Sequence, residues 1–189
     1  MAKLLTLLLL TFAVANAQKY HVGRAATAAE IKSTDQFMAP DGTGLPPGKG
    51  TAADGRDIYE RRCARCHGKQ GQGDEEGPLA GGKGTLNTAK PLKTVGSFWP
   101  YATTIYDYVH RAMPFDNPGL LDANQTYAVT ALILHLNGII GEKDEMNAQT
   151  LPKVKMPNRD GFVKDTRPDT GKKKKASSLF GVGKDGRAQ

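Results

Sequence analysis

The strongest constraint on this chain is a short stretch that carries its only two cysteines, Cys63-Ala64-Arg65-Cys66-His67. The spacing C-x-x-C-H is the attachment pattern of a c-type haem. Both thiols add to vinyl groups of the porphyrin, and the histidine binds the iron as the proximal ligand. The motif therefore predicts one covalently attached haem c, held through Cys63 and Cys66, with His67 on the metal.

Three other interpretations of the motif are weaker. A C-x-x-C redox dithiol needs a βαβ context, and the sequence shows none. A zinc site needs four ligands, and there is no second cysteine pair and no histidine-rich partner. A plain disulfide would leave His67 without a role.

The N-terminus predicts export. Lys3 is followed by an apolar run from Leu4 to Val14 and by an A-x-A site at Ala15-Asn16-Ala17, which is the form of a signal peptide. The run is too short to cross a bilayer, because a spanning helix needs about 20 apolar residues. We expect cleavage near Ala17-Gln18, a periplasmic location and no transmembrane span.

Charge and composition divide the rest of the chain. After the signal peptide (1–17) we expect an N-terminal arm (18–50), a core domain around the haem motif (51–140), a packed extension (141–163) and a disordered basic tail (164–189). Eight lysines and arginines and three aspartates give the tail a net charge of +5, out of +7 for all 189 residues. The basic character therefore belongs to the tail, which could contact an anionic surface. An exported chain without an aromatic–basic groove is not expected to bind nucleic acid.

Two capping boxes mark the first and last helices of the core. Thr51 and Asp54 open a helix over 52–66, and Asp122 and Gln125 open one over 122–137 that Gly138 ends. The first helix has an inner face of Ala52, Gly55, Tyr59, Cys63 and Cys66. A glycine inside a helix predicts close approach by another helix, here the closing one.

A third helix is expected between them. Thr104-x-x-Asp107 has the form of a cap for a helix over 104–112, with an apolar stripe of Ile105, Tyr108, Val109 and Ala112. The segments between the helices are rich in glycine and proline. The expected fold class is all-α.

Several residues are candidates for the surroundings of the haem. A carbonyl in Gly77-Pro78-Leu79 can accept the Nδ1 proton of His67. Trp99 and Tyr101, in an aromatic loop, can pack on the haem edge and donate to propionates, or serve as ordinary core aromatics.

The expected distal ligand is Met113, which leaves the middle helix just before Pro114. A thioether paired with a histidine is the ligand set of an electron carrier. The rival ligands are Met156, which also precedes a proline, His110 and His135, and less plausibly His21 and Met38 in the arm.

Taken together, these features resemble a class I cytochrome c. More narrowly, the chain is similar over about residues 23–165 to the SoxD-like cytochrome subunits that accompany periplasmic sulfite dehydrogenases. The stretches that carry this narrower resemblance are Lys93-Thr94-Val95-Gly96-Ser97-Phe98-Trp99-Pro100-Tyr101-Ala102-Thr103-Thr104, Arg111-Ala112-Met113-Pro114-Phe115, Leu136-Asn137-Gly138-Ile139-Ile140 and Met156-Pro157-Asn158-Arg159-Asp160-Gly161-Phe162.

The resemblance implies a class I cytochrome c fold around one covalent haem, with irregular N- and C-terminal extensions. It implies a periplasmic carrier of single electrons whose partners are redox proteins, namely a molybdenum sulfite dehydrogenase and a downstream cytochrome or oxidase. Two alternatives remain open: a free shuttle from another dehydrogenase to a terminal oxidase, and a haem enzyme or gas sensor in which Met113 does not bind the iron. Whether the protein is itself part of an enzyme is left open.

Overall fold

The computed structural model describes residues 23–34 and 37–167. The predicted signal peptide, His21 and the tail from residue 168 lie outside the described residues. The chain divides into two compact units, Met1–Gln36 and Phe37–Gln189. In the first, the described element is helix α2 (Ala28–Thr34). No helix in the described ranges has the length and apolar character needed to cross a membrane.

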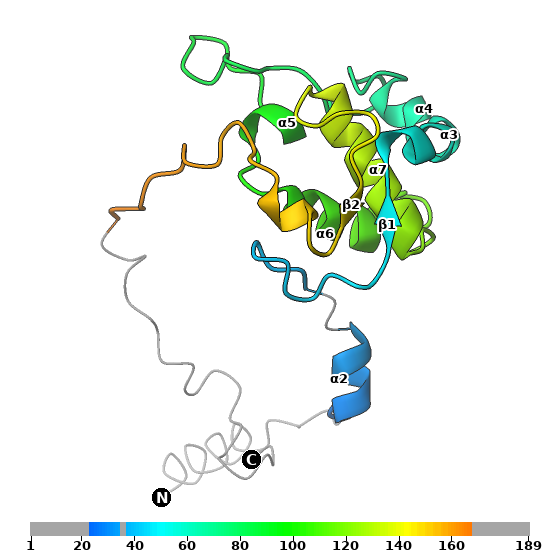
Figure 1. The fold of residues 1–189 in the computed structure, drawn as a ribbon. Coiled ribbons are helices and arrows are strands. Elements are labelled where there is room, and N and C mark those ends of the chain that lie inside the picture. The colour runs from blue at the N-terminus through cyan, green and yellow to red at the C-terminus, as the bar shows by residue number, and fades with distance from the viewer. Residues whose placement is uncertain (1–22, 35–36, 168–189) are drawn as a thin grey trace, which may run out of the picture. The chain divides into compact units, whose positions relative to one another are not determined.

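The second unit is helical, which confirms the all-α prediction. Its helices are α3 (Ala52–Arg62), α4 (Ala64–His67), α5 (Val95–Phe98), α6 (Ala102–Ala112), α7 (Ala123–Leu136) and the 3-10 turn η1 (Leu151–Lys153). Two short strands, β1 (Lys49–Gly50) and β2 (Met146–Asn147), pair antiparallel with Gly50 opposite Met146 (Figure 1). The ladder joins the residues before α3 to the segment that follows α7.

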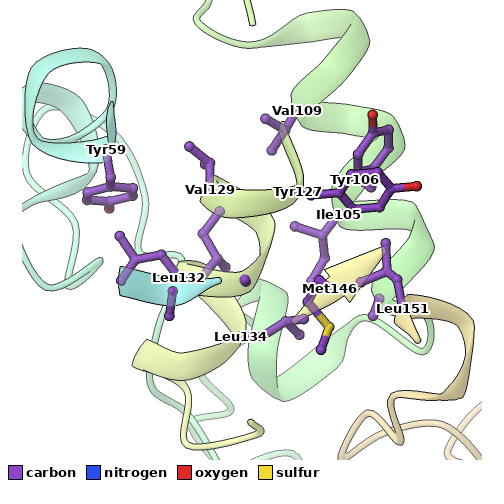
Figure 2. Close-up of a cluster of buried hydrophobic side chains, with 14 of the residues drawn as sticks. Tyr59, Ile105, Tyr106, Val109, Tyr127, Val129, Leu132, Leu134, Met146 and Leu151 are labelled. Atoms are coloured by element: carbon purple, nitrogen blue, oxygen red, sulfur yellow. The ribbon is translucent and has the colours of Figure 1, made fainter. Parts of the chain in front are cut away.

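Helix α7 is the centre of the core. Every residue from Thr126 to Leu134 is buried. The predicted capping box is present, because the Asp122 side chain accepts from the Gln125 N–H and the Gln125 side chain accepts from Asp122. The helix ends as expected before Gly138, whose φ of +65° favours glycine. Side chains from α3, α6, α7, β2 and η1 meet in one apolar cluster (Figure 2).

Helices α3 and α7 pack without side chains between them at one point. A Cβ on Gly55 would collide with the backbone carbonyl of Ala128 and lie 3.1 Å from the Leu132 Cβ. A Cβ on Gly50, in β1, would lie 2.5 Å from the Ala128 nitrogen. The prediction that Gly55 marks the approach of the closing helix is therefore confirmed.

The first helix was expected to run unbroken over 52–66, and the structure corrects this. It stops at Arg62, and Cys63, with φ −123° and ψ −36°, separates α3 from α4. The Cys63 N–H still bonds to the Tyr59 carbonyl at 2.8 Å. The break is thus a local turn of the backbone at the cysteine.

The prediction for the middle helix was wrong in its start and in the placement of Tyr108, whereas Ile105 and Val109 are buried as expected. Helix α6 begins at Ala102 and has Tyr101, which makes no side-chain capping bond, at its N-cap. The buried face includes Ala102, Ile105, Tyr106 and Val109, at the i, i+3, i+4, i+7 spacing of one helix face. Tyr108, placed in the stripe by the sequence, is 48% exposed.

Asp107 has a different role from the predicted cap. It is 7% exposed, accepts from the Met38 N–H at 3.3 Å and receives the Arg111 Nε–H at 2.9 Å. These bonds satisfy a carboxylate that would otherwise be costly to bury. They also attach the segment before β1 to α6.

The contact between α3 and α7 can be tested with Gly55→Ala. We expect a loss of about 1–3 kcal/mol in the free energy of unfolding, because the added methyl group overpacks the helix contact. The measurement is guanidinium denaturation followed by circular dichroism. Gly77→Ala is the control, since a Cβ there meets nothing within 4 Å, and its effect should stay within about 1 kcal/mol of zero. Equal stability of the two variants would contradict the proposed packing.

Candidate functional site

The motif residues lie on one helical turn. Cys63 precedes α4, and Cys66 and His67 are in its last turn. The N–H groups of Cys66 and His67 both donate to the Cys63 carbonyl, at 3.2 and 3.0 Å. Both cysteines are free thiols, and burial raises the pKa of the Cys63 thiol to about 11, with a smaller contribution from Cys66. The backbone therefore presents two thiols and an imidazole from adjacent positions.

The imidazole of His67 is oriented by the loop that follows it. Its Nδ1 lies 3.0 Å from the carbonyl oxygen of Gly77, immediately before Pro78. A carbonyl can only accept, so Nδ1 carries the proton and Nε2 keeps its lone pair. The expected bond between the ring and the 77–79 segment is present, and it leaves Nε2 available as a metal ligand.

The loop is folded back onto α4 by its backbone. The Gly73 N–H donates to the His67 carbonyl, and the Glu76 N–H donates to the Cys66 carbonyl, both at 2.8 Å. In addition, the Tyr59 hydroxyl donates to the Gly68 carbonyl at 3.0 Å. The carbonyl ends of α4 are therefore capped by the chain itself.

Met113 ends α6 and is partly buried. Its N–H bonds to the Val109 carbonyl at 3.1 Å, and its peptide bond to Pro114 is cis. The residue packs against the core as one of a partly buried set that also includes Cys63, Leu79 and Trp99.

The turn after Met113 lies near the motif helix. The pKa of the Arg65 guanidinium is raised by its hydrogen bond to Cys66, by Glu75 and, to a smaller extent, by Asp116. Arg65 belongs to α4, so Asp116 lies within electrostatic range of the motif.

The rival ligands lie in different surroundings. Met156 and Met38 are 1% and 6% exposed and belong to the apolar core. His135 Nδ1 lies 3.2 Å from the Ile140 carbonyl. The His110 ring stacks on Tyr106 with centroids 5.8 Å apart, and its buried Nδ1 has no hydrogen-bond partner among the described residues.

The two aromatic candidates contact different parts of the chain. Trp99 is partly buried and meets Tyr108 edge to face, with ring centroids 5.8 Å apart. The Tyr101 ring lies 4.3 Å from the guanidinium carbon of Arg159, beside a hollow of about 580 Å³ that Pro40 and Pro152 also line. Tyr101 therefore contacts the segment after α7, and its predicted bond to a propionate stays a prediction.

These donors suit a c-type haem. Two thiols are available for covalent attachment, one imidazole has its Nε2 free for iron, and one thioether follows α6. Within residues 23–34 and 37–167, no three or more histidine, cysteine, aspartate or glutamate side chains gather in a group that could hold a metal ion.

Comparison with known proteins decides the family. The family profile "Cytochrome c" matches residues 52–137. A chain in the crystal structure of the sulfane dehydrogenase SoxCD from Paracoccus pantotrophus is 42% identical, with a TM-score of 0.72 and coverage of 81% of this chain and 76% of that chain. This chain belongs to the cytochrome c family. The cytochrome is of class I and resembles the SoxD cytochrome subunit, as the sequence predicted. A search of curated proteins found no match to it.

The family implies covalently bound haem c and electron transfer, and the cytochrome carries the required motif at Cys63, Cys66 and His67. One detail differs from the sequence-based resemblance. The solved neighbour is a sulfane dehydrogenase, whereas the resemblance was to cytochromes of sulfite dehydrogenases.

Two asparagines near the site were missed by the sequence analysis. The Asn158 amide donates to the Phe98 carbonyl at 2.8 Å, and the Asn137 amide donates to the Leu79 carbonyl at 3.1 Å. Both partners are more than fifty residues away in sequence. Asn137 precedes Gly138, and that pair signalled only the end of a helix.

The buried tyrosines predict loss of stability at alkaline pH. Burial raises the pKa of Tyr59 and of Tyr127 to about 12, above about 10 for an unfolded chain. The unfolded state thus loses protons first, so their contribution is complete below about pH 10 and falls as pH rises towards about 12. Guanidinium midpoints measured from about pH 8 to 11 should show this decline.

Tyr59→Phe isolates one of these groups. It should lower stability at neutral pH by about 1 kcal/mol, because the Gly68 carbonyl loses its donor, and its decline above about pH 10 should be shallower than that of the wild type. Tyr108→Phe, at an exposed position, is the control and should follow the wild type. A decline as steep in Tyr59→Phe as in the wild type would contradict the assignment.

Proposed function

We propose that this cytochrome is an exported single-haem carrier that accepts electrons from a sulfur-oxidising dehydrogenase and passes them to a downstream cytochrome or oxidase. The observation that carries the proposal is the extent of the likeness to SoxCD. That match covers 81% of the chain, whereas the family profile starts at residue 52 and ends at 137. Similarity outside the common core supports a shared partner, because the common core alone serves many electron donors.

Four residues would hold the haem. Cys63 and Cys66 would form the thioether bonds, His67 would bind iron through Nε2, and Met113 would bind through its sulfur. The Nδ1 bond to Gly77 and the position of Met113 at the end of α6 support this set. When bound, the haem supplies reversible one-electron chemistry. If His67 and Met113 both bind the iron, oxygen and substrates would be kept off the metal, which favours a carrier.

Pro78, Trp99 and Tyr101 have supporting roles in this proposal. Pro78 stiffens the segment whose Gly77 carbonyl accepts from His67. Trp99 would pack on the haem edge, and Tyr108 is its edge-to-face partner. Tyr101 is held by Arg159, so a propionate bond from its hydroxyl would have to form beside that cation.

The partner we propose is a molybdenum dehydrogenase subunit that oxidises sulfane or sulfite sulfur. Its docking surface would include the turn after Met113, where Phe115 is 86% exposed and Leu120 is 40% exposed. The extension would add Phe162, which is 54% exposed and packs on Phe98 with ring centroids 5.2 Å apart. Large exposed apolar side chains close to a functional site are typical of protein–protein contacts.

Export and the segment boundaries rest on the sequence. The signal peptide at 1–17 would direct the chain to the periplasm, where c-type haem is attached. In this proposal the arm spans 18–50, the haem domain 51–140 and the extension 141–163, and the β1–β2 ladder joins the end of the arm to the extension. In this proposal the basic tail from Lys164 contacts an anionic surface.

The decisive experiment is metal analysis of the tagged protein after cross-linking in its own cells. We expect iron and molybdenum in equal amounts and a second, larger polypeptide, followed by reduction of the haem on addition of a sulfane compound or sulfite. Iron without molybdenum would support the free shuttle instead. Absence of iron would contradict the haem assignment.

Docking can be separated from haem chemistry with Phe115→Glu. A charge at this exposed apolar position should slow reduction by the dehydrogenase about tenfold or more, since interface aromatics often contribute above about 1 kcal/mol. Reduction by dithionite should be unchanged, because that reductant needs no docking. Equal loss with both reductants would indicate damage to the haem site and would contradict the docking role.

The distal ligand can be tested with a pair of substitutions. Met113→Leu should change the visible spectrum of the oxidised protein and allow carbon monoxide to bind the reduced protein at neutral pH, because the sixth ligand is lost. Met156→Leu, in the core, is the control and should keep the spectrum, with a loss of less than about 1.5 kcal/mol. An unchanged spectrum in Met113→Leu, or a changed one in Met156→Leu, would overturn the assignment.

A further inference from the structure

The amide of Asn137 ties the loop after the motif to the end of α7. We call residues 68–82 the proximal loop. Asn137 Oδ1 accepts from the Gly81 N–H at 3.1 Å, and Nδ2 donates to the carbonyls of Leu79 at 3.1 Å and Ile133 at 2.8 Å. Both amide N–H bonds and the carbonyl are therefore used, in a partly buried position.

The proximal loop is also held by the residues that cap α5. The hydroxyl of Thr94 donates to the Gly81 carbonyl at 2.8 Å, and Thr94 is 3% exposed. The same hydroxyl oxygen accepts from the Ser97 N–H at 3.0 Å as the cap of α5. Gly81 is thus bonded through its N–H to the end of α7 and through its carbonyl to the start of α5.

Gly96 provides the space in which the Asn137 amide lies. A Cβ on Gly96 would collide with the Oδ1 and Cγ atoms of Asn137. The φ of Gly96 is not in the left-handed region, so glycine is required here for space and not for backbone conformation. α5, α7 and the proximal loop therefore meet at one amide.

The attached segment contains the acceptor for His67. Gly77 lies two residues before Leu79, whose carbonyl is bonded to Asn137 and whose N–H donates to the Gly71 carbonyl at 2.8 Å. Fixing Leu79 at both its N–H and its carbonyl limits the movement of the Gly77 carbonyl, which lies 3.0 Å from the His67 ring.

We propose that Asn137, lying against Gly96, is a positioning residue that keeps the Gly77 carbonyl on Nδ1 of His67 and so tunes the proximal imidazole. The inference rests on the proposed function in one respect, the role of His67 as iron ligand. A hydrogen bond from Nδ1 makes the imidazole a stronger electron donor to a metal. Mutation of the hydrogen-bond partner of a metal-bound histidine typically lowers metal affinity or activity about 10- to 100-fold. A stronger donor favours the oxidised metal.

The experiment uses the haem-loaded protein in five forms: wild type, Asn137→Ala, Gly96→Ala, the double variant and Asn158→Ala. The first readout is hydrogen exchange of the His67 Nδ1–H in the reduced, ¹⁵N-labelled protein. The second is the midpoint potential, and the third is the free energy of unfolding. Asn158→Ala is the matched control, because it also removes an amide-to-carbonyl bond but one that does not reach the proximal loop.

Asn137→Ala and Gly96→Ala should each speed Nδ1–H exchange about tenfold or more. Each should raise the potential, by about 59 mV if the equilibrium constant for reduction changes tenfold. Asn158→Ala should leave both readouts at the wild-type values. In the double variant the methyl group added at position 96 enters the space left by the amide, so most of the stability lost in Gly96→Ala should return while exchange stays fast.

Wild-type exchange and potential in Asn137→Ala, or equal changes in Asn158→Ala, would overturn the inference. If Asn137→Ala does not fold, Asn137→Ser gives the same comparison with a smaller cavity and the same expected direction. If the wild-type protein is found to contain no haem, the proposed function is contradicted but the role of Asn137 can still be tested. The Gly81 N–H donates to Asn137, so its hydrogen exchange in the wild type and in Asn137→Ala reports whether the asparagine holds the proximal loop.

Discussion

The contact of α3 and α7 at Gly55 is the constraint on which the rest of this cytochrome depends. Because no side chain separates the helices there, the backbone of α3 rests on Ala128. Cys63 follows the end of α3, and Asn137 follows the end of α7. One backbone contact therefore fixes the relation between the residues that would attach the haem and the residue that holds the proximal loop. A wider spacing of the helices would shift the motif relative to that loop.

The segment after α7 supports the C-terminal end of α5. Asn158 bonds to the Phe98 carbonyl, Phe162 packs on the Phe98 ring, and Arg159 lies over Tyr101. Helix α5 has only four residues and could not be stable alone, because helices this short lack the cooperativity to form. Its position comes from the extension on one side and from Thr94 and Gly96 on the other. Residues beyond the family core of 52–137 are therefore needed to hold α5 in place.

Features that leave a local signature in the sequence could be predicted, and bonds to a distant residue without such a signature could not. The caps at Thr51 and Asp122, the glycine contact at Gly55 and the acceptor near Gly77 follow from local chemistry, and all are present. Asp107 shows the limit. It stands three residues after Thr104, as a cap requires, yet it bonds to Met38, 69 residues away. No local pattern around Asp107 indicates that distant partner, so Asp107 was taken for part of a cap and the start of α6 was misplaced.

The neutral hydrogen bonds around the motif and the exposed charges around it have different roles. The groups that bond to the Gly68 carbonyl, to His67 Nδ1 and to Gly81 are a tyrosine hydroxyl, a backbone carbonyl, an asparagine amide and a threonine hydroxyl, all neutral. Neutral fixed dipoles need little rearrangement when a nearby charge changes by one unit, which suits electron transfer. The charged groups near the motif are exposed: Arg65 and Glu75 form a pair whose side chains are 84% and 58% exposed. Exposed ion pairs add little stability. Charges beside the motif instead influence how a redox partner approaches and orients.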